Sequence, residues 1–310
     1  MPYALVLDSE VTDTSLPILY PDPGMSPGTL FLFDAAHSQS GLTAGVVPTS
    51  GTFPNIARDT AAAALNKSAS LLDWTVDYAR TAGDASFKVE RTAKGGIHAV
   101  SSQVGQISAV GDYWRITPLL DLRQGLLDAV PGSALFAINW YIITRLGISS
   151  GNAAMQSMMH IVNGASSTGN ALYFTRFDRF SSINGDGGGF MRGPTANGPA
   201  NTPAYTYVAA SAWTNAKPAS PASAFITPAV LGRDTAWSGF NVNKAPSLIL
   251  YRSKIEDLSK TKRANNGAGG TFAEEAAAAL AIEQGLFTAA FGAGGKFNGD
   301  TWSDPATWLP

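Results

Sequence analysis

The stretch that decides the fold begins with Leu248-Ile249-Leu250-Tyr251 and continues, three residues later, with Ile255-Glu256-Asp257-Leu258. The first run is apolar and has the length of a strand. A glycine-rich break, Gly267-Ala268-Gly269-Gly270, leads into a helical pattern, and the tail Gly299-Asp300-Thr301-Trp302-Ser303-Asp304-Pro305 follows. The order is a strand, a loop, a capped helix and an aromatic tail, and it contains no obvious reactive group. This indicates the closing element of a β-rich structural domain and not part of a catalytic cleft.

The helical pattern predicts one helix from about Phe272 to Phe291. Thr271 and Glu274 form a Thr-x-x-Glu capping box, in which each side chain satisfies an amide at the helix start. Glu274 and Glu275 also suit the positive end of the helix dipole. Apolar residues recur at helical spacing and predict the face that packs on a sheet: Ala276, Leu280, Phe287 and Phe291, with Leu286 and Ala290 beside them.

Outward from this stretch, the chain has the pattern of an antiparallel β-sandwich. Many short apolar runs are separated by glycine and proline, with no alternation of strands and helices. The expected strands are Leu30–Phe33, Phe87–Glu90, Ile97–Val100, Tyr113–Ile116, Leu135–Ile143, Ala171–Phe177, Tyr205–Ala209 and Leu248–Tyr251. One further helix is expected over Asn55–Lys67. The residues expected in the core are Trp140, Tyr141, Ile143, Leu172, Phe174 and Ile249.

Two regions follow from the distribution of proline. Residues 1–28 hold five prolines, including those of Pro21-Asp22-Pro23-Gly24. Because proline fixes φ and removes a backbone donor, this segment is expected to be an extended arm or an irregular lead-in. Residues 29–310 are expected to form the β-sandwich domain, including the helix at about 272–291.

Composition limits the classes of partner. Of the 310 residues 45% are apolar and only 14% charged, against a usual charged share of about 25%. Such a surface must be covered by small polar residues or by neighbouring subunits. The formal net charge is −2 and the 21 basic residues are scattered, which argues against nucleic-acid binding. Cysteine is absent, so disulfides and thiolate metal sites are excluded.

The termini and apolar runs also argue against export and membrane insertion. The first residues lack the basic region and the cleavage site of a signal peptide. The longest uncharged apolar run, Ala134–Ile143, is half the roughly 20 residues that a membrane helix needs. We therefore expect a soluble protein that does not contact a membrane.

One motif is typical of a hydrolase nucleophile. Gly147-Ile148-Ser149-Ser150-Gly151 matches the Gly-x-Ser-x-Gly elbow and follows a strong strand pattern. In that family the base histidine follows the serine, but the last histidine here, His160, lies only eleven residues beyond Ser149 and none follows. A Gly/Ser turn between two strands is the better interpretation.

Other candidate site residues also favour structural roles. His37, His98 and His160 lack the short spacing of a metal site, and His98 reads as a core or interface residue. Asp186 lies among glycines without the alternating acids of a calcium loop. Glycosidases need only two carboxylates at the right separation, and these can come from distant strands, so this possibility stays open. The adjacent pairs do not fit, because Glu256 and Asp257 point in opposite directions on a strand and Glu274-Glu275 belongs to the helix cap. Trp213, Trp237 and Trp302 fit core or interface roles better than sugar stacking.

Several motifs resemble those of tailed-bacteriophage virion proteins. They are Phe53-Pro54-Asn55-Ile56-Ala57, then Lys94-Gly95-Gly96-Ile97-His98-Ala99-Val100-Ser101-Ser102-Gln103, and the ending from Leu250-Tyr251 through Gly299-Asp300-Thr301-Trp302. The resemblance covers about residues 30–310. It implies a concanavalin A-like or laminin-G-like jelly-roll located in a tail, baseplate or fibre, and it carries over no catalytic residue.

The sequence thus predicts a structural virion protein assembled in the host cytoplasm, without enzymatic activity. No catalytic residue, cofactor or metal ligand is expected. The expected partners are other tail proteins and further copies of the chain, with a trimer favoured, and contact with host surface glycans stays open. The alternative is a glycan-binding or glycan-depolymerising module.

Overall fold

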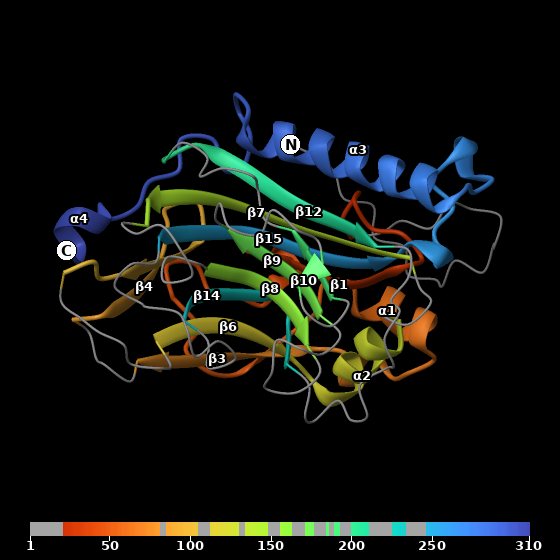
Figure 1. Cartoon of the computed structure of the whole chain (residues 1–310), viewed down its shortest axis with the longest axis horizontal. Helices are drawn as coiled ribbons and strands as arrows, with labels where there is room; N and C mark the ends of the chain where they lie inside the picture. Colours follow the sequence, from red (N-terminus) through yellow and green to blue (C-terminus); the bar gives the residue numbers. More distant parts are fainter. Residues whose placement is uncertain are drawn as a thin grey trace, which may run out of the picture.

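The computed structural model describes residues 21–80, 85–104, 112–129, 134–147, 156–162, 171–176, 184–185, 189–192, 200–210, 225–233 and 246–310. The fold is mainly β, as the sequence predicts, with the predicted C-terminal helix packed on it (Figure 1). Among the described residues, no helix is long and apolar enough to cross a membrane.

The central sheet is built around the long strand β15, Ser247–Asp257. Its order is β12-β7-β15-β5-β4, and β1 also pairs with β15, beyond the end of β5. These partners are β1 (Thr29–Asp34), β4 (Phe87–Arg91), β5 (Ile97–Ser101), β7 (Leu135–Arg145) and β12 (Pro203–Ala210). All eleven residues of β15 are buried, because both faces of the central sheet are covered.

Two further sheets complete the β structure. One has the order β14-β6-β3-β2, from β2 (Thr52–Phe53), β3 (Trp74–Arg80), β6 (Asp112–Pro118) and β14 (Ala229–Arg233). The other has the order β10-β11-β9-β8-β13, from β8 (Gln156–Val162), β9 (Ala171–Arg176), β10 (Asn184–Gly185), β11 (Gly189–Arg192) and β13 (Phe225–Thr227). The β9–β11 pair is parallel and the other pairs are antiparallel.

The inner core lies between the central sheet and the sheet of β3 and β6. Phe33 of β1 packs edge-on against Trp74 of β3 at 5.6 Å between ring centroids, and lies 6.4 Å from Trp114 of β6. Helices α1 (Arg58–Leu65) and α2 (Leu120–Ala129) supply Ala61 and Leu126 to the same cluster. Aromatic side chains of this size contribute much of the apolar area that a core removes from water.

The outer face of the central sheet is covered by α3, Phe272–Phe291 (Figure 1). Thr271 and Glu274 form the predicted capping box. Leu280, Phe287 and Phe291 pack against the outer-face cluster, and the Phe287 ring lies edge-on to Trp140 of β7 at 5.6 Å. The predicted helix and its packing face are therefore confirmed.

The C-terminal tail, residues 297–310, continues the cover past the end of α3. Phe297 packs 4.5 Å from the ring of Tyr251, whose hydroxyl donates to Asp300 at 2.7 Å. Arg145 of β7 donates to the carbonyls of Pro305 and Leu309 at 3.1 and 3.0 Å. The tail includes the short helix α4 (Pro305–Trp308), so the outer face is covered by helix along one part and by tail along another.

Of the predicted core residues, Trp140, Tyr141, Ile143 and Ile249 are buried, which confirms them. The side chains of Leu172 and Phe174, on β9, lie outside what the structure describes. The helix expected over Asn55–Lys67 is shorter, as α1 shows.

Residues 21–28, here called the lead-in, differ from the extended arm that the prolines suggested. Its backbone forms two hydrogen-bonded turns, closed by Met25 N to Asp22 O at 3.0 Å and by Thr29 N to Ser26 O at 2.9 Å. Asp22, Gly24, Met25, Ser26 and Gly28 are buried. The proline-rich pattern predicts irregular backbone here. It does not predict the contacts that hold this backbone against the domain, because the charged residues that make them lie more than two hundred positions away.

Candidate functional site

The most unusual site in the described residues lies where the lead-in, β15 and α3 meet. It begins with a register shift in β15: Leu250 pairs with Tyr141 of β7, whereas Arg252 pairs with Trp140, so Tyr251 is an extra residue. A bulge of this kind reverses which face the following residues occupy. Ile249 and Tyr251 face α3 before the bulge, and Arg252 faces it after the bulge.

The consequence is a row of charged side chains on the outer face of the sheet. Lys254 and Glu256 follow Arg252 at alternate positions and share its side, while Ile255 between them enters the inner core. Without the extra residue, all three charges would point into the apolar core. The bulge therefore places them opposite α3 and the lead-in.

Arg252 is the centre of the site and is 1% exposed. It makes paired hydrogen bonds to Asp22 of the lead-in, both at 2.8 Å, and to Glu283 of α3, both at 3.0 Å. Asp34 lies 3.4 Å away on the same guanidinium. The Trp140 ring faces the guanidinium carbon at 4.9 Å. Such forked pairing is what a planar guanidinium allows and a lysine does not.

Lys254 and Arg263 extend the site towards the start of α3. The Lys254 ammonium lies 2.9 Å from Glu256 and 3.3 Å from Glu283. Arg263 donates to both oxygens of Glu256 and, at 2.5 Å, to the carbonyl of Gly24. Lys254 also donates to the Gly24 carbonyl. One peptide group of the lead-in thus receives hydrogen bonds from two cations.

The lead-in contributes two further contacts. Ser26 donates its hydroxyl to Glu256. Gly24 lies so close to the charges that a Cβ there would be 2.6 Å from the Arg252 guanidinium and 2.7 Å from the Glu283 carboxylate. A glycine is therefore required sterically at this point of the lead-in.

We call these eight residues the charge cluster: Asp22, Asp34, Arg252, Lys254, Glu256, Arg263, Glu283 and Lys296. Lys296 closes it with an ion pair to Asp34 at 2.5 Å. The formal charges are four positive and four negative, so the cluster is neutral as a whole. Burying an ion pair gains little net stability, but removing one partner leaves a buried charge and costs about 3–5 kcal/mol. The cluster therefore selects one position for the lead-in more than it adds stability.

The pKa shifts agree with this geometry. Burial would raise the pKa of Asp22, but the hydrogen bonds and charge of Arg252 outweigh it and lower the pKa to about 2. Burial would likewise raise the pKa of Glu256, and Lys254 and Arg263 lower it. Burial would lower the pKa of Arg252, whereas Glu283, Asp22 and Asp34 raise it well above its usual value. All three groups are charged at neutral pH.

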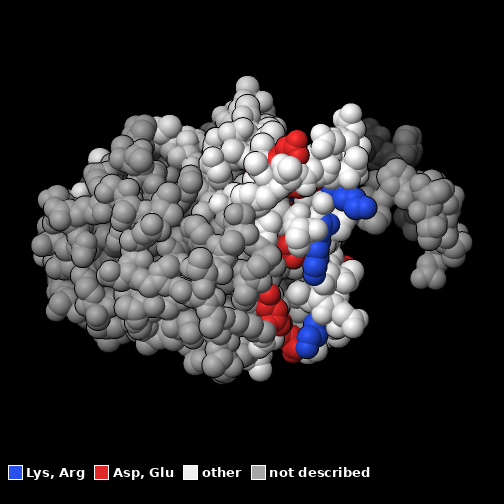
Figure 2. Space-filling model, turned by 45° about the vertical axis from the view of Figure 1, so that its right-hand side comes forward, with Lys and Arg blue, Asp and Glu red and all other residues white. Residues whose placement is uncertain are grey.

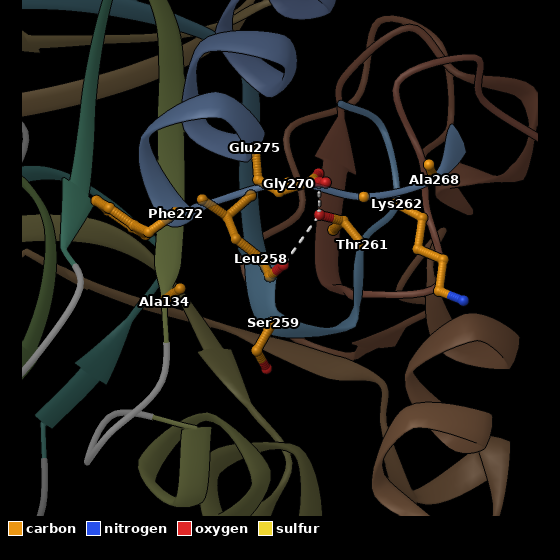
Figure 3. Close-up of a pocket in the computed structure, with 10 residues that line it drawn as sticks. Ala134, Leu258, Ser259, Thr261, Lys262, Ala268, Gly270, Phe272 and Glu275 are labelled. Carbon is orange, nitrogen blue, oxygen red and sulfur yellow. Dashed lines mark hydrogen bonds between the residues drawn. The ribbon is translucent and has the colours of Figure 1, made fainter. Parts of the chain in front are cut away.

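A hollow of about 550 Å³ opens beside the charge cluster, at the start of α3. It lies between the beginning of β7 and the loop that follows β15 (Figure 3). Its lining is mostly small, apolar or backbone: Ala134, Leu258, Ser259, Thr261, Lys262, Ala268, Gly269, Gly270, Phe272 and Glu275. The Glu275 carboxylate is 3% exposed and already accepts from the Thr261 hydroxyl at 2.6 Å and from the Arg263 and Ala264 amides at 3.0 and 3.2 Å.

His98 lies on the outer face of the central sheet, beneath the C-terminal tail, and is fully buried. Its Nδ1 is 2.7 Å from Glu90 and its Nε2 is 2.9 Å from the Thr144 hydroxyl. Trp302 and Trp308 of the tail lie 6.4 and 6.1 Å from the ring. Burial lowers the pKa of His98, although Glu90 opposes it, so the ring is neutral at pH 7. Both nitrogens have partners, as the sequence interpretation of a satisfied histidine expected.

The remaining candidates are dispersed or lie outside the described residues. His37 is half-buried near the start of the lead-in, where its Nε2 is 3.0 Å from the Pro21 carbonyl oxygen. His160 lies on β8, paired with Tyr173 of β9 and Thr227 of β13. Ser149, Asp186, Trp213 and Trp237 fall outside what is described. Within the described part of the chain, no three His, Asp or Glu side chains gather as a metal site would require.

The carboxylate pairs are also accounted for. Glu256 belongs to the charge cluster, and Asp257 accepts hydrogen bonds from the Ser259 amide and hydroxyl at 3.0 and 2.6 Å. Glu274 receives the Thr271 amide at 2.7 Å as part of the helix cap. Reasoning from sequence missed the charge cluster, although one signal was present: Arg252, Lys254 and Glu256 alternate, as one face of a strand does.

Comparison of the chain with protein-family models, with curated proteins and with solved structures found no match. Function is therefore inferred from the site itself and from the motifs of the sequence.

Proposed function

We propose that this chain is a structural subunit of a tailed-phage virion, located in the tail at the baseplate or a tail fibre, and that it assembles with further copies of itself or with other tail proteins. The motifs of the sequence and the mainly β architecture support this proposal. In it the chain has no catalytic role, and residues 1–20 reach a neighbouring subunit.

The observation that carries the proposal is the charge cluster at the lead-in. Asp22, the Gly24 carbonyl and Ser26 are bound by buried groups from β15, α3 and the loop between them. An arm that docks on a neighbour transmits force to the point where it leaves its own domain. Because withdrawal of the lead-in would leave Arg252 and Lys254 buried without these partners, this point is strongly anchored.

The low charge of the surface supports the same proposal. Charged residues are 14% of the chain, and eight of them form the charge cluster. Figure 2 shows the described charged side chains on one face of the molecule. Positive and negative side chains are interspersed there, and the described ones form no large patch of one sign. A subunit packed among others needs few solvated charges, whereas a free-standing protein uses them for solubility.

Two measurements test the proposal. Mass spectrometry of purified particles should detect the chain in stoichiometric amounts. Light scattering of the recombinant protein should show an oligomer that is lost or weakened when residues 1–20 are removed, with unchanged far-ultraviolet circular dichroism. A monomer that is indifferent to this truncation and absent from particles would favour the alternative, a glycan-binding module.

A further inference from the structure

We propose that the hollow at the start of α3 is the receptor for the N-terminal segment, residues 1–20, of a second copy of the chain. This inference depends on the proposed function, because it names the surface through which copies assemble. It is carried by the chemistry of the hollow, the composition of the segment and the place where the lead-in begins.

The lining of the hollow fits an uncharged or apolar chain segment. Ala134, Leu258 and Phe272 supply apolar surface, and Gly269 and Gly270 leave backbone within reach of a partner. The Glu275 carboxylate is occupied by internal hydrogen bonds. A volume of about 550 Å³ is at the scale of clefts that bind small ligands, roughly 300–1,000 Å³.

The charges beside the hollow are complementary to the segment. Lys262 lines it and is exposed, and Lys260 next to it is also exposed while donating to the Ala64 carbonyl at 2.6 Å. The exposed acid nearby, Glu274, is turned to the helix cap. Residues 1–20 contain three acids, Asp8, Glu10 and Asp13, and no Lys, Arg or His. They also contain the apolar run Leu5-Val6-Leu7, so the segment offers both apolar anchors and the opposite charge.

The position of the lead-in leaves residues 1–20 able to reach a second copy. Asp22 is linked through Arg252 to Glu283, which lies about two turns along α3 from Glu275 at the hollow, or about 12 Å at 1.5 Å per residue. The lead-in runs from there towards the hollow as the chain proceeds from Asp22 to Gly28, so the segment before Pro21 starts at the far end. Twenty extended residues span at most about 66 Å, enough to reach the hollow of a neighbour as well as the hollow of the same chain, and the proposed assembly of copies favours the neighbour. Extended segments that dock in this way gain affinity from backbone and apolar contacts.

Disulfide trapping tests the proposal directly, because the chain has no cysteine of its own. Leu5→Cys and Ser259→Cys proteins are made separately, mixed and oxidised. We expect a disulfide that joins one chain of each kind, seen on non-reducing gels and located by peptide mass spectrometry. The matched control pairs Leu5→Cys with Thr288→Cys, an exposed position near the other end of α3, and should give several-fold less product.

A filling variant adds a readout that does not depend on thiols. Ala268→Trp places a large side chain at an exposed position of the hollow, and Ala277→Trp places the same side chain on the exposed side of α3. Light scattering should show that the first lowers the oligomeric fraction and the second does not, with equal circular dichroism. Lys262→Glu should weaken the oligomer in the same assay, most strongly at low salt.

The outcomes separate this inference from the proposed function. Leu5→Cys and Ser259→Cys are also combined in one chain. If the disulfide between positions 5 and 259 forms only within a monomer of this double variant, the inference is overturned, because the segment then docks on its own domain. An oligomer that resists both Ala268→Trp and disulfide trapping would also overturn it and leave the proposed function standing. A protein that is monomeric under all conditions and absent from particles would overturn both.

Discussion

Arg252 is among the largest side chains that the described part of the fold buries completely. Its position depends on three segments at once, because its partners come from the lead-in, β1 and α3. A guanidinium removed from water is stable only where its donors are met by acceptors of opposite charge. The buried position of Arg252 is therefore stable only when all three segments are in place.

Arg252→Met should therefore destabilise the fold strongly, by about 3–5 kcal/mol, because Asp22 would stay buried without its ion-pair partner and Glu283 would keep only Lys254. Urea unfolding followed by circular dichroism measures this. Arg58→Met is the control, since Arg58 is exposed at the start of α1 and should change stability by no more than about 0.5 kcal/mol. Equal midpoints for the two variants would mean that the charge cluster does not hold the lead-in.

Asp22 gives a prediction for acid. Its folded pKa of about 2 lies below the ordinary 3.8, so the ionised form favours the folded state. Its contribution is complete above about pH 4 and is lost as the pH falls towards 2. Thermal unfolding between pH 7 and pH 2 should show wild type losing stability in this window more steeply than Asp22→Asn. Parallel curves for the two proteins would contradict the assignment.

At the scale of elements, local signals predicted what local physics determines. The capping box and the apolar spacing gave α3 its observed bounds, because both lie within a few turns of one helix. β3, Trp74–Arg80, and α2, Leu120–Ala129, were missed. Local signals were present in both, because Trp74 and Val76 alternate as one face of a strand does and α2 supplies Leu122, Leu126 and Leu127 to the inner core. The bulge at Tyr251 could not be predicted from local sequence, because it is defined by the register of β15 against the partner strand β7.

The Gly-x-Ser-x-Gly motif is a second case in which local sequence was not sufficient. A helix after the Gly-x-Ser-x-Gly motif would cover Asn152–Val162, whereas the structure has strand β8 from Gln156 to Val162, as the alternative of a turn between strands requires. The histidine argument was incomplete, because His98 precedes the serine and sequence order does not restrict which side chains meet in space. The structure pairs His98 with Glu90 and Thr144 under the tail.

Leu280→Asp tests the packing of α3 as an element. Leu280 packs against the outer-face cluster, so a carboxylate there would be placed against apolar side chains of the sheet. We expect a loss of at least about 2 kcal/mol, the lower end for removal of a core leucine. Ala281→Asp, one residue further on and exposed, is the control and should cost only about 0.5 kcal/mol of helix propensity. Denaturant midpoints of the two variants decide the matter.

At the scale of the whole molecule, the outer face of the central sheet is covered largely by chain that follows β15. Before α3 and the tail are added, the face presents a contiguous set of large apolar side chains: Phe136, Ile138, Trp140, Ile142, Ile249 and Tyr251. It also presents Arg252 and Lys254 without Glu283. Exposed apolar patches of this size drive association, so the chain that follows β15 is needed for a folded monomeric unit.

A chain that ends at Asp257 should therefore fail to form a stable domain, although it retains every strand of the central sheet. We expect aggregates that bind a hydrophobic dye and lack a cooperative unfolding transition. The matched truncation, residues 21–310, keeps Asp22, Gly24 and Ser26 and with them the lead-in side of the charge cluster, so it should unfold cooperatively like the full chain. Scattering, dye fluorescence and circular dichroism of both proteins make the comparison. If residues 1–257 formed a soluble, cooperative monomer, the outer cover would be an addition to the fold. We expect it to be a condition of folding, because exposure of the apolar face and the loss of Glu283 beside Arg252 and Lys254 act in the same direction.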